Sequence, residues 1–306
     1  MKIWIELNIL KEKNVNQLRE KYPEVEWTTD LENRFDSDAI FAMPQTLKKD
    51  LLDQFKQLKW IQLLSAGYDT MDQEYLKQRK IMLSNAPDVY SISIAEDVFS
   101  KILWFNRNLE GYKHQMKEGL WKNIHVSHEI CESTVGIIGA GSIGKEVAKR
   151  MKAFGARVLG YKRTYEALEN FDEIYVDQEG LNTIYKESDY LIVTLPSSKE
   201  TKNMIGKDAF ELFKPSLLFI NVSRGDVVDQ DVLVDALINH KIRAAGLDVM
   251  VPEPLPKDHV LWTLDNVFIT PHNSIGSPHI QDRLIKVLSN SLHNYKKHIE
   301  LPNRIC

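Results

Sequence analysis

Three ionisable side chains in the second half of the chain are of the types that bind a carboxylate and move a proton. Arg224 follows an apolar run over residues 217–222, Glu253 lies between two prolines, and His272 follows a second apolar run over residues 267–270. A guanidinium binds a carboxylate through two parallel hydrogen bonds, and a histidine can give a proton to a carbonyl oxygen near neutral pH. A carboxylate beside the imidazole would stabilise its protonated form. Singly, each residue has an ordinary alternative as a surface arginine, a solvated glutamate or a lone loop histidine, so the prediction depends on the three acting together.

A glycine spacing typical of dinucleotide binding precedes them. Gly139, Gly141 and Gly144 form G-x-G-x-x-G directly after the apolar run 134–138 and at the start of a helical pattern over residues 142–154. In this context the first glycine permits a tight turn, the second lets a pyrophosphate approach the backbone, and the third lets helix and strand pack closely. The N-terminus of the helix offers unpaired N–H groups to phosphates. The alternative is a purely structural turn. The residues expected to touch a dinucleotide are Gly139, Gly141, Ser142, Ile143 and Gly144.

The turn after the next apolar run, residues 157–161, indicates which dinucleotide fits. An NAD site usually has an acidic residue here, which bonds the ribose 2′-hydroxyl. In this chain Lys162, Arg163 and Thr164 follow instead. Two cations and a hydroxyl suit the 2′-phosphate of NADP, because cations make strong hydrogen bonds with phosphate. The turn therefore predicts NADP as the preferred cofactor over NAD. The alternative is a solvated basic turn without a ligand.

Short apolar runs alternate with amphipathic helical patterns over most of the chain, which predicts α/β layers. Many of the runs are apolar at successive positions, as in parallel strands buried on both faces. The helical patterns cover residues 92–118, 142–154, 230–239 and 278–298, with Asp229 as a plausible N-cap. The predicted strands are residues 2–6, 39–43, 61–64, 134–138, 157–161, 190–195, 217–222, 245–249 and 267–270.

The composition limits the classes of partner. The 306 residues are 43% apolar and 27% charged with a net charge of −4, which excludes a disordered tail protein and gives no reason to expect nucleic acid as a ligand. Near the start of the chain the acidic Glu6 interrupts the apolar stretch that a signal peptide would need. No apolar run approaches the roughly 18 residues of a membrane helix. With only two cysteines, far apart in sequence, we expect a cytoplasmic protein without a membrane partner.

A metal site is the less favoured interpretation of one further cluster. His125, His128 and Cys131 have a spacing that metal ligands can use, but no second pair completes the four ligands of a structural site. We expect a surface or linker role for these residues and no metal. Cys131 and Cys306 are then reduced thiols.

The motifs, in this order, closely resemble those of the D-specific 2-hydroxyacid dehydrogenases, which include glyoxylate/hydroxypyruvate reductases and phosphoglycerate dehydrogenases. Two positions depart from the usual pattern, since Asp97 stands where many members carry histidine and the basic turn replaces the usual acid. The resemblance begins near residue 60 and continues to the end of the chain. The matching stretches are residues 135–144, 195–196, 221–237, 246–255 and 266–272, with residues 65–69 and 95–97 as substrate-domain signatures.

The resemblance implies two Rossmann-like, doubly wound parallel-sheet domains and a homodimer. Residues 1–95 with 274–306 would form a discontinuous substrate (catalytic) domain, and residues 96–273 the dinucleotide-binding domain. By the same resemblance Arg224 binds the carboxylate and carbonyl of the substrate, His272 is the acid/base, and Glu253 pairs with His272. The other residues assigned in this way are Asp248 and Pro196 at the cofactor, and the loop Ser65, Ala66 and Gly67 at the substrate carboxylate.

The activity expected from the resemblance is reduction of a small 2-oxoacid, such as glyoxylate or hydroxypyruvate, to the D-2-hydroxyacid with hydride from NAD(P)H. The alternative is a non-enzymatic, nucleotide-sensing corepressor of the same fold, which resembles this family down to the three side chains. A formate dehydrogenase of the same superfamily is disfavoured, because those enzymes resemble this chain but carry glutamine where Glu253 stands.

Overall fold

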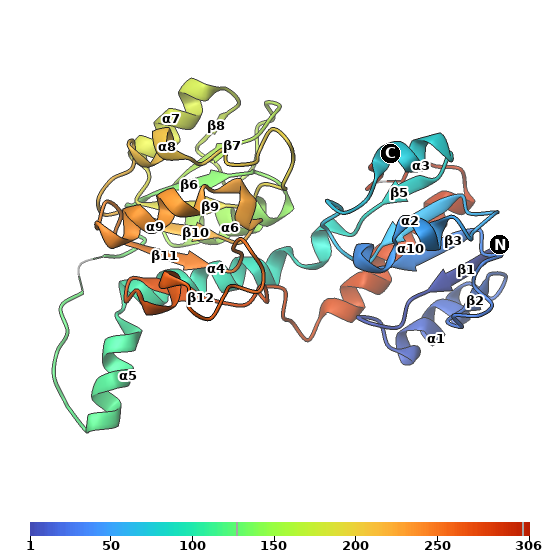
Figure 1. Cartoon of the computed structure of the whole chain (residues 1–306), viewed down its shortest axis with the longest axis horizontal. Coiled ribbons are helices and arrows are strands. Elements are labelled where there is room, and N and C mark those ends of the chain that lie inside the picture. Colours follow the sequence, from blue (N-terminus) through green and yellow to red (C-terminus); the bar gives the residue numbers. More distant parts are fainter. Residues whose placement is uncertain (127, 302) are drawn as a thin grey trace. The chain divides into compact units, whose positions relative to one another are not determined.

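The computed structural model describes residues 1–126, 128–301 and 303–306. The chain forms two compact units, one of Met1–Tyr90 with Ser277–Cys306 and one of Ser91–Gly276 (Figure 1). Each unit has a parallel sheet with helices, so the predicted α/β class with two parallel-sheet domains is confirmed.

The first unit is built on a five-stranded sheet in the order β2-β1-β3-β4-β5, with all neighbours parallel. Strands β3 and β4 are buried throughout, as expected for a central parallel strand. The strands are β1 (Lys2–Ile5), β2 (Glu26–Thr28), β3 (Ala39–Ala42), β4 (Trp60–Leu63) and β5 (Met82–Ser84). The helices are α1 (Glu12–Lys21), α2 (Lys49–Leu52), α3 (Gln73–Gln78) and α10 (Ile280–Lys296).

The last helix, α10, packs against this first sheet. Its Tyr295 ring stacks on Trp60 of β4 with 4.6 Å between ring centroids. The Tyr22 hydroxyl, at the end of α1, donates to the backbone carbonyl of Ser289 at 2.8 Å. The end of the chain therefore completes the unit in which the chain begins.

The second unit has a seven-stranded parallel sheet in the order β12-β11-β10-β9-β6-β7-β8. The first strand along the chain, β6, lies in the middle, so the strand order reverses between β6 and β9. Ligands of open parallel sheets bind at such a reversal, beyond the carboxyl ends of the strands. The strands are β6 (Thr134–Ile138), β7 (Arg157–Tyr161), β8 (Glu173–Tyr175), β9 (Tyr190–Val193), β10 (Leu218–Asn221), β11 (Ala244–Leu247) and β12 (Val267–Ile269). The helices are α4 (Ser91–Asn106), α5 (Leu109–Glu118), α6 (Ser142–Ala153), α7 (Gln178–Glu187), α8 (Lys207–Phe210) and α9 (Gln230–Ile238).

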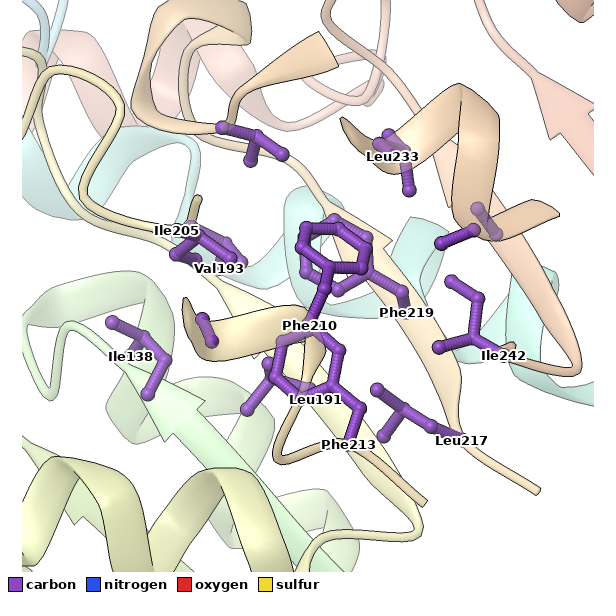
Figure 2. Close-up of a cluster of buried hydrophobic side chains, with 14 of the residues drawn as sticks. Ile138, Leu191, Val193, Ile205, Phe210, Phe213, Leu217, Phe219, Leu233 and Ile242 are labelled. Carbon is purple, nitrogen blue, oxygen red and sulfur yellow. The ribbon is translucent and has the colours of Figure 1, made fainter. Parts of the chain in front are cut away.

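One hydrophobic cluster fixes the positions of the central strands (Figure 2). Phe219 of β10 lies among the rings of Phe210 and Phe213, and Leu191 of β9 and Ile242 before β11 are fully buried in the same cluster. Burying a side chain of this size contributes roughly 1.5–3 kcal/mol. The cluster thus sets the places from which the loops beyond β9, β10 and β11 start.

The structure corrects one predicted helix and adds elements that were not predicted. The expected single helix over residues 92–118 is two helices, α4 and α5, because Asn108 adopts a left-handed conformation (φ 47°) and caps α5 by accepting from the N–H of Gly111. The sequence reasoning missed the strands β2, β5 and β8, which have three residues each, too few to show a clear periodicity. It also did not single out the helices α1, α2, α3, α7 and α8. The other predicted strands and the Asp229 N-cap of α9 are confirmed, with ends shifted by one or two residues.

Candidate active site

The glycine turn has the geometry that a dinucleotide needs. Gly139 has φ +110°, and its N–H donates to the carbonyl of Tyr161 at the end of β7 at 2.9 Å. A Cβ on Gly139 would meet the backbone of Thr194 at 2.9 Å, and a Cβ on Gly144 would meet the carbonyl oxygen of Gly139 at 2.5 Å. A Cβ on Gly141 would meet nothing within 4 Å. Two glycines are therefore required by packing, whereas the middle one leaves open space beside the backbone, which fits a pyrophosphate.

The N-terminus of α6 adds donors to this open space. Its N-cap is Gly141, which has no side chain to cap the helix. Within the described part of the chain, the backbone N–H groups of Ser142, Ile143 and Gly144 donate to no other group. Uncapped amides and the positive end of the helix dipole bind phosphate. The site residues thus fit a dinucleotide, and binding would satisfy donors that the protein leaves unpaired.

The turn after β7 holds a feature that the sequence reasoning missed. Lys162 Nζ lies 2.5 Å from the carboxylate of Glu166, four residues further on in the same loop, and this hydrogen bond lowers the pKa of the Glu166 carboxyl. Lys162 is 22% exposed, whereas Arg163 is exposed and makes no hydrogen bond or ion pair with any described residue. Thr164 is exposed as well. Of the two predicted cations, Lys162 is thus in a direct ion pair, whereas Arg163 acts on a carboxylate only through its charge, which helps to lower the pKa of Glu200. No sequence signal marked this pair, because the i, i+4 rule holds for helices and residues 162–166 form a loop.

The loops beyond the next strands lie side by side because the strands end level with one another. Asn221 of β10 pairs with Leu247 of β11, and Leu247 pairs with Ile269 of β12. A Cβ on Gly225 would lie 2.3 Å from the carbonyl oxygen of Met250, so the loops after β10 and β11 touch through their backbones. This contact brings together Arg224, directly before Gly225, and the loop that carries Glu253. Pro196, after β9, is exposed near the same edge.

Arg224 is held by its own loop. Its half-buried guanidinium donates from Nη1 to the carbonyl of Ser223 at 2.7 Å, and its carbonyl accepts from the Asn221 amide at 3.1 Å. The Asn221 amide oxygen in turn accepts from both the N–H and the hydroxyl of Ser223. The buried end of β10 therefore fixes the backbone from which the guanidinium projects.

Asp248 organises the loop after β12. Its side chain is 1% exposed, and it accepts from the Thr270 hydroxyl at 2.6 Å, the Asn273 N–H at 2.9 Å and the Ser274 N–H at 3.2 Å. Burial alone would raise the pKa of Asp248, but these hydrogen bonds outweigh it and leave the pKa below its usual value. The carbonyl of Asp248 also accepts from the N–H of His272 at 2.8 Å. The carboxylate is thus ionised, and its hydrogen bonds hold this loop in place.

His272 and Glu253 form a direct pair. His272 Nδ1 lies 2.8 Å from Glu253 Oε2, with 45% of the imidazole and 36% of the carboxylate exposed. Glu253 Oε1 accepts from the N–H of Met250 at 3.1 Å. His272 has φ 49°, a left-handed conformation that is uncommon for a residue with a side chain. Because Glu253 occupies Nδ1, the remaining ring nitrogen, Nε2, is the one available for proton exchange with a ligand.

Gln230 positions the Glu253 loop and was not singled out from the sequence. From the first turn of α9, its amide Nε2 donates to the carbonyl of Val251 at 2.5 Å and its Oε1 accepts from the N–H of Val251 at 2.8 Å. The two bonds clamp the backbone two residues before Glu253. No sequence signal marks this role, since it depends on α9 lying beside the loop.

The loop Ser65, Ala66 and Gly67 belongs to the first unit. The Ser65 hydroxyl donates to the carbonyl of Gly67 at 2.8 Å, and the Asn85 amide donates to the carbonyl of Ala66 at 2.7 Å. Among the described residues, the N–H groups of Ala66 and Gly67 have no acceptor. The loop is therefore fixed through its carbonyls and presents two backbone donors.

His125 and His128 lie elsewhere, in the lining of a polar cavity of about 270 Å³ at the amino-end edge of the second sheet. Arg243 lines the same cavity, and burial together with Arg243 lowers the pKa of His128. Cys131 is exposed and not part of the lining. In the described ranges no group of three or more histidine, cysteine or acidic side chains is arranged to hold a metal.

A parallel-sheet unit with this glycine turn belongs to the dinucleotide-binding class, and an acid/base pair at the same sheet edge adds an oxidoreductase site. Residues 99–274 match the family model described as D-isomer specific 2-hydroxyacid dehydrogenase, NAD binding domain. The chain belongs to the D-isomer-specific 2-hydroxyacid dehydrogenase family. It is an oxidoreductase that binds a nicotinamide cofactor, and the expected membership is confirmed.

Relatives cover nearly the whole chain. It is 30% identical to a glyoxylate reductase of Pyrococcus furiosus, over 94% of this chain and 90% of the relative. It is 37% identical to a glyoxylate/hydroxypyruvate reductase B of Pectobacterium atrosepticum, over 79% of this chain and 76% of the relative. An acyclic imino acid reductase in complex with NADPH and D-Arg has a TM-score of 0.86 at 26% identity, covering all of both chains. A D-lactate dehydrogenase of Aquifex aeolicus with NAD and lactic acid has a TM-score of 0.77 at 26% identity, over 97% of this chain and 96% of that one.

None of the helices in the described ranges has both the length and the apolar character that a membrane span requires.

Proposed function

We propose that the enzyme reduces a small 2-oxoacid to the D-2-hydroxyacid with NAD(P)H. The observation that carries the proposal is the 2.8 Å pair of His272 and Glu253, in a loop that lies against the loop of Arg224. Reduction of a 2-oxoacid needs a cation for the carboxylate and a proton donor for the carbonyl oxygen, and these side chains supply both. The relatives named as glyoxylate and hydroxypyruvate reductases support glyoxylate or hydroxypyruvate as the substrate class.

The residues have separate roles in this reaction. The cofactor, when bound, supplies the hydride. Arg224 binds the substrate carboxylate and polarises the carbonyl, and the N–H groups of Ala66 and Gly67, in the loop that Ser65 begins, bind the carboxylate oxygens. His272 donates its Nε2 proton to the carbonyl oxygen. Glu253 fixes the ring through Nδ1 and stabilises the protonated imidazole before transfer.

The cofactor preference rests on the turn after β7. Structural neighbours at the same 26% identity carry NADPH in one case and NAD in the other, so they do not favour either. Arg163 is exposed and makes no hydrogen bond or ion pair with a described residue, whereas Lys162 is paired with Glu166. We propose that Arg163 is the main contact of a 2′-phosphate, with Lys162 and Thr164 as secondary contacts, and that NADPH is preferred over NADH.

The family resemblance implies that one unit binds the substrate and the other binds the dinucleotide. We propose that residues 1–95 with 274–306 carry substrate-binding groups and residues 96–273 the dinucleotide. We also propose a homodimer, because α5 and the residues after it expose a row of large apolar side chains, of which Trp121 is fully exposed. Figure 1 shows α5 extending away from the sheet of its unit. The row consists of Leu109, Tyr112, Met116, Leu120 and Trp121.

Light scattering tests the dimer. The wild type should have twice the mass of one chain, and Met116→Asp with Trp121→Asp should reduce that mass. A monomeric wild type contradicts the dimer but leaves the proposed activity unaffected.

A cytoplasmic location remains the prediction made from the sequence.

A panel of 2-oxoacids assayed with NADH and NADPH tests the activity. We expect turnover at an ordinary enzymatic rate, of order 1–10³ per second, with at least one small 2-oxoacid. Chiral analysis of the product should give the D-isomer. Absence of turnover with every member of the panel, in protein that binds the cofactor, would support the corepressor alternative, which no relative or structural feature favours at present.

A further inference from the structure

A polar stripe on α4 lies beneath the loop that carries His272. Ser93, Asp97 and Lys101 are spaced four residues apart and therefore share one face of the helix. Ser93 and Lys101 are buried, and the Asp97 side chain is 17% exposed. The helix packs against β10 and β11 of the second unit (Figure 1). Such a stripe is unusual on a helix face that covers a sheet, because that face is ordinarily apolar.

Lys101 is a buried cation with one ion-pair partner. Its side chain is 0% exposed, and its ammonium pairs with the carboxylate of Asp97 one turn earlier. Its methylene stem crosses β11 at Gly246, where an added Cβ would lie 2.9 Å from Lys101 Cδ. The absence of a side chain at position 246 is what lets the lysine lie there. A buried ion pair contributes little or nothing to stability compared with apolar side chains of the same size.

The pair adjoins Asp248. Burial raises the pKa of Asp97, Lys101 opposes this rise, and the negative charge of Asp248 adds to it. Lys101 passes β11 at Gly246, two residues before Asp248, and its ammonium pairs with Asp97. Asp97 and Asp248 are both largely shielded from solvent, and the ammonium offsets one of their two negative charges. Since Asp248 is held ionised by hydrogen bonds from the loop, the Lys101 charge offsets a surplus of negative charge.

The same helix face also bonds the loop directly. The Ser93 hydroxyl donates to the carbonyl of Ile275 at 3.1 Å, while Asp248 accepts from Thr270, Asn273 and Ser274. The loop over residues 270–275 is thus fastened at both ends to groups that belong to or adjoin the stripe. His272 lies in the middle of this loop.

We propose that Lys101 is a positioning residue: by pairing with Asp97 it cancels the negative charge that Asp97 would otherwise place beside Asp248, so that the His272 loop stays fixed for proton transfer. The inference rests on the proposed function for the reaction it serves. Its physical claim, that charge balance under Asp248 orders the loop, concerns this chain alone. Asp97, the residue that departs from the family pattern, is then paired with a lysine that balances it.

The test removes charge without removing volume. In Lys101→Met, two carboxylates remain without a counter-ion, so protonation should begin at higher pH. Hydrogen exchange of a peptide spanning residues 270–276 should rise at least about threefold near pH 6, because the Asn273 and Ser274 amides lose their acceptor. The turnover number should fall by about tenfold or more, and its pH profile should gain an acidic limb that the wild type lacks.

The charge-balanced double variant separates electrostatics from packing. Asp97→Asn with Lys101→Met removes both charges and should return loop exchange close to the wild-type rate and abolish the acidic limb. Lys149→Met removes an exposed lysine of the same unit and should change neither measurement. Other charged groups of this unit, among them His272 on the loop and Arg150 on α6, which pairs with Glu146 and Glu96, stay constant across the variants.

The hydrogen-exchange results test the proposed role of Lys101 independently of the enzyme activity. Unchanged loop exchange in Lys101→Met, or a double variant as disturbed as the single one, overturns it. If Lys101→Met does not fold, a folded double variant with wild-type loop exchange supports the charge argument, and a double variant that also fails to fold contradicts it. Hydrogen exchange of the loop is measured without substrate, so its result holds even if the enzyme does not catalyse the proposed reaction.

Discussion

Glu253 joins His272 to the backbone of its own loop, with Oε2 2.8 Å from His272 Nδ1 and Oε1 3.1 Å from the Met250 N–H. One carboxylate therefore both orients the imidazole and is itself oriented. The loop of Met250 touches Gly225, next to Arg224, so the acid/base pair and the carboxylate-binding cation share one backbone framework.

Replacing the proton donor should abolish most of the activity. In His272→Gln the amide can hydrogen-bond but cannot transfer a proton, and general acid catalysis supplies roughly 10²–10⁴-fold. We expect the turnover number to fall by about a hundredfold or more, measured under saturating substrate. His279→Gln, an exposed histidine in the first unit, is the control and should behave as wild type. Near-normal turnover in His272→Gln would remove this residue from the mechanism.

Replacing Glu253 should lower the rate by releasing the imidazole. Glu253→Gln keeps the shape but removes the charge that pairs with His272 Nδ1 at 2.8 Å. We expect the turnover number to fall by about tenfold under saturating substrate, because the ring loses its charged partner. A turnover number close to that of the wild type would show that the pair does not serve the reaction.

The cofactor turn predicts opposite effects of two neighbouring residues. Arg163→Ala should weaken NADPH binding by about tenfold or more and leave NADH binding little changed, because a charge-assisted contact to phosphate contributes roughly 1.5–3 kcal/mol. Glu166→Gln should strengthen NADPH binding, since it releases the Lys162 charge. Fluorescence titration with each cofactor measures both. If the wild type binds NADH more tightly and Arg163→Ala affects both cofactors equally, the proposed NADP preference is wrong.

Alanine substitutions at two glycines of the same motif should change different properties, stability in one case and cofactor affinity in the other. Gly144→Ala places a Cβ 2.5 Å from the Gly139 carbonyl and should lower the free energy of unfolding by about 1–3 kcal/mol. Gly141→Ala meets no protein atom within 4 Å, so its stability should be close to wild type while cofactor affinity falls. Denaturant unfolding without cofactor and titration with cofactor separate the two effects. Equal destabilisation by both substitutions would contradict the geometry of the turn.

Asp248 should stabilise the protein in a pH-dependent way. Its folded-state pKa is lowered by hydrogen bonds that outweigh burial, so its contribution is present above the unfolded-state value, about 3.9, and is lost as the pH falls through the folded-state value. Asp248→Asn should cost about 1–3 kcal/mol at pH 7 and less at acid pH. Unfolding curves at pH 7 and below pH 4 measure the difference. Asp235→Asn, at an exposed carboxylate, should show much smaller changes.

The sequence by itself determined the fold class, the glycine turn and the family. These features are local, since successive apolar residues specify a buried parallel strand, and G-x-G-x-x-G specifies its turn within six residues. The candidate side chains Arg224, Glu253 and His272 were also found from their places after apolar runs.

Only the tertiary structure decided how those side chains are held. The Gln230 clamp, the Gly225–Met250 contact and the Lys101–Asp97 pair beneath Asp248 join segments that are distant in sequence or hidden in a helical pattern. The break at Asn108 depends on a backbone conformation that apolar periodicity does not encode. These features arise because burial and strand order bring loops together at one sheet edge, and their hydrogen bonds and charges then depend on neighbours that no local pattern specifies.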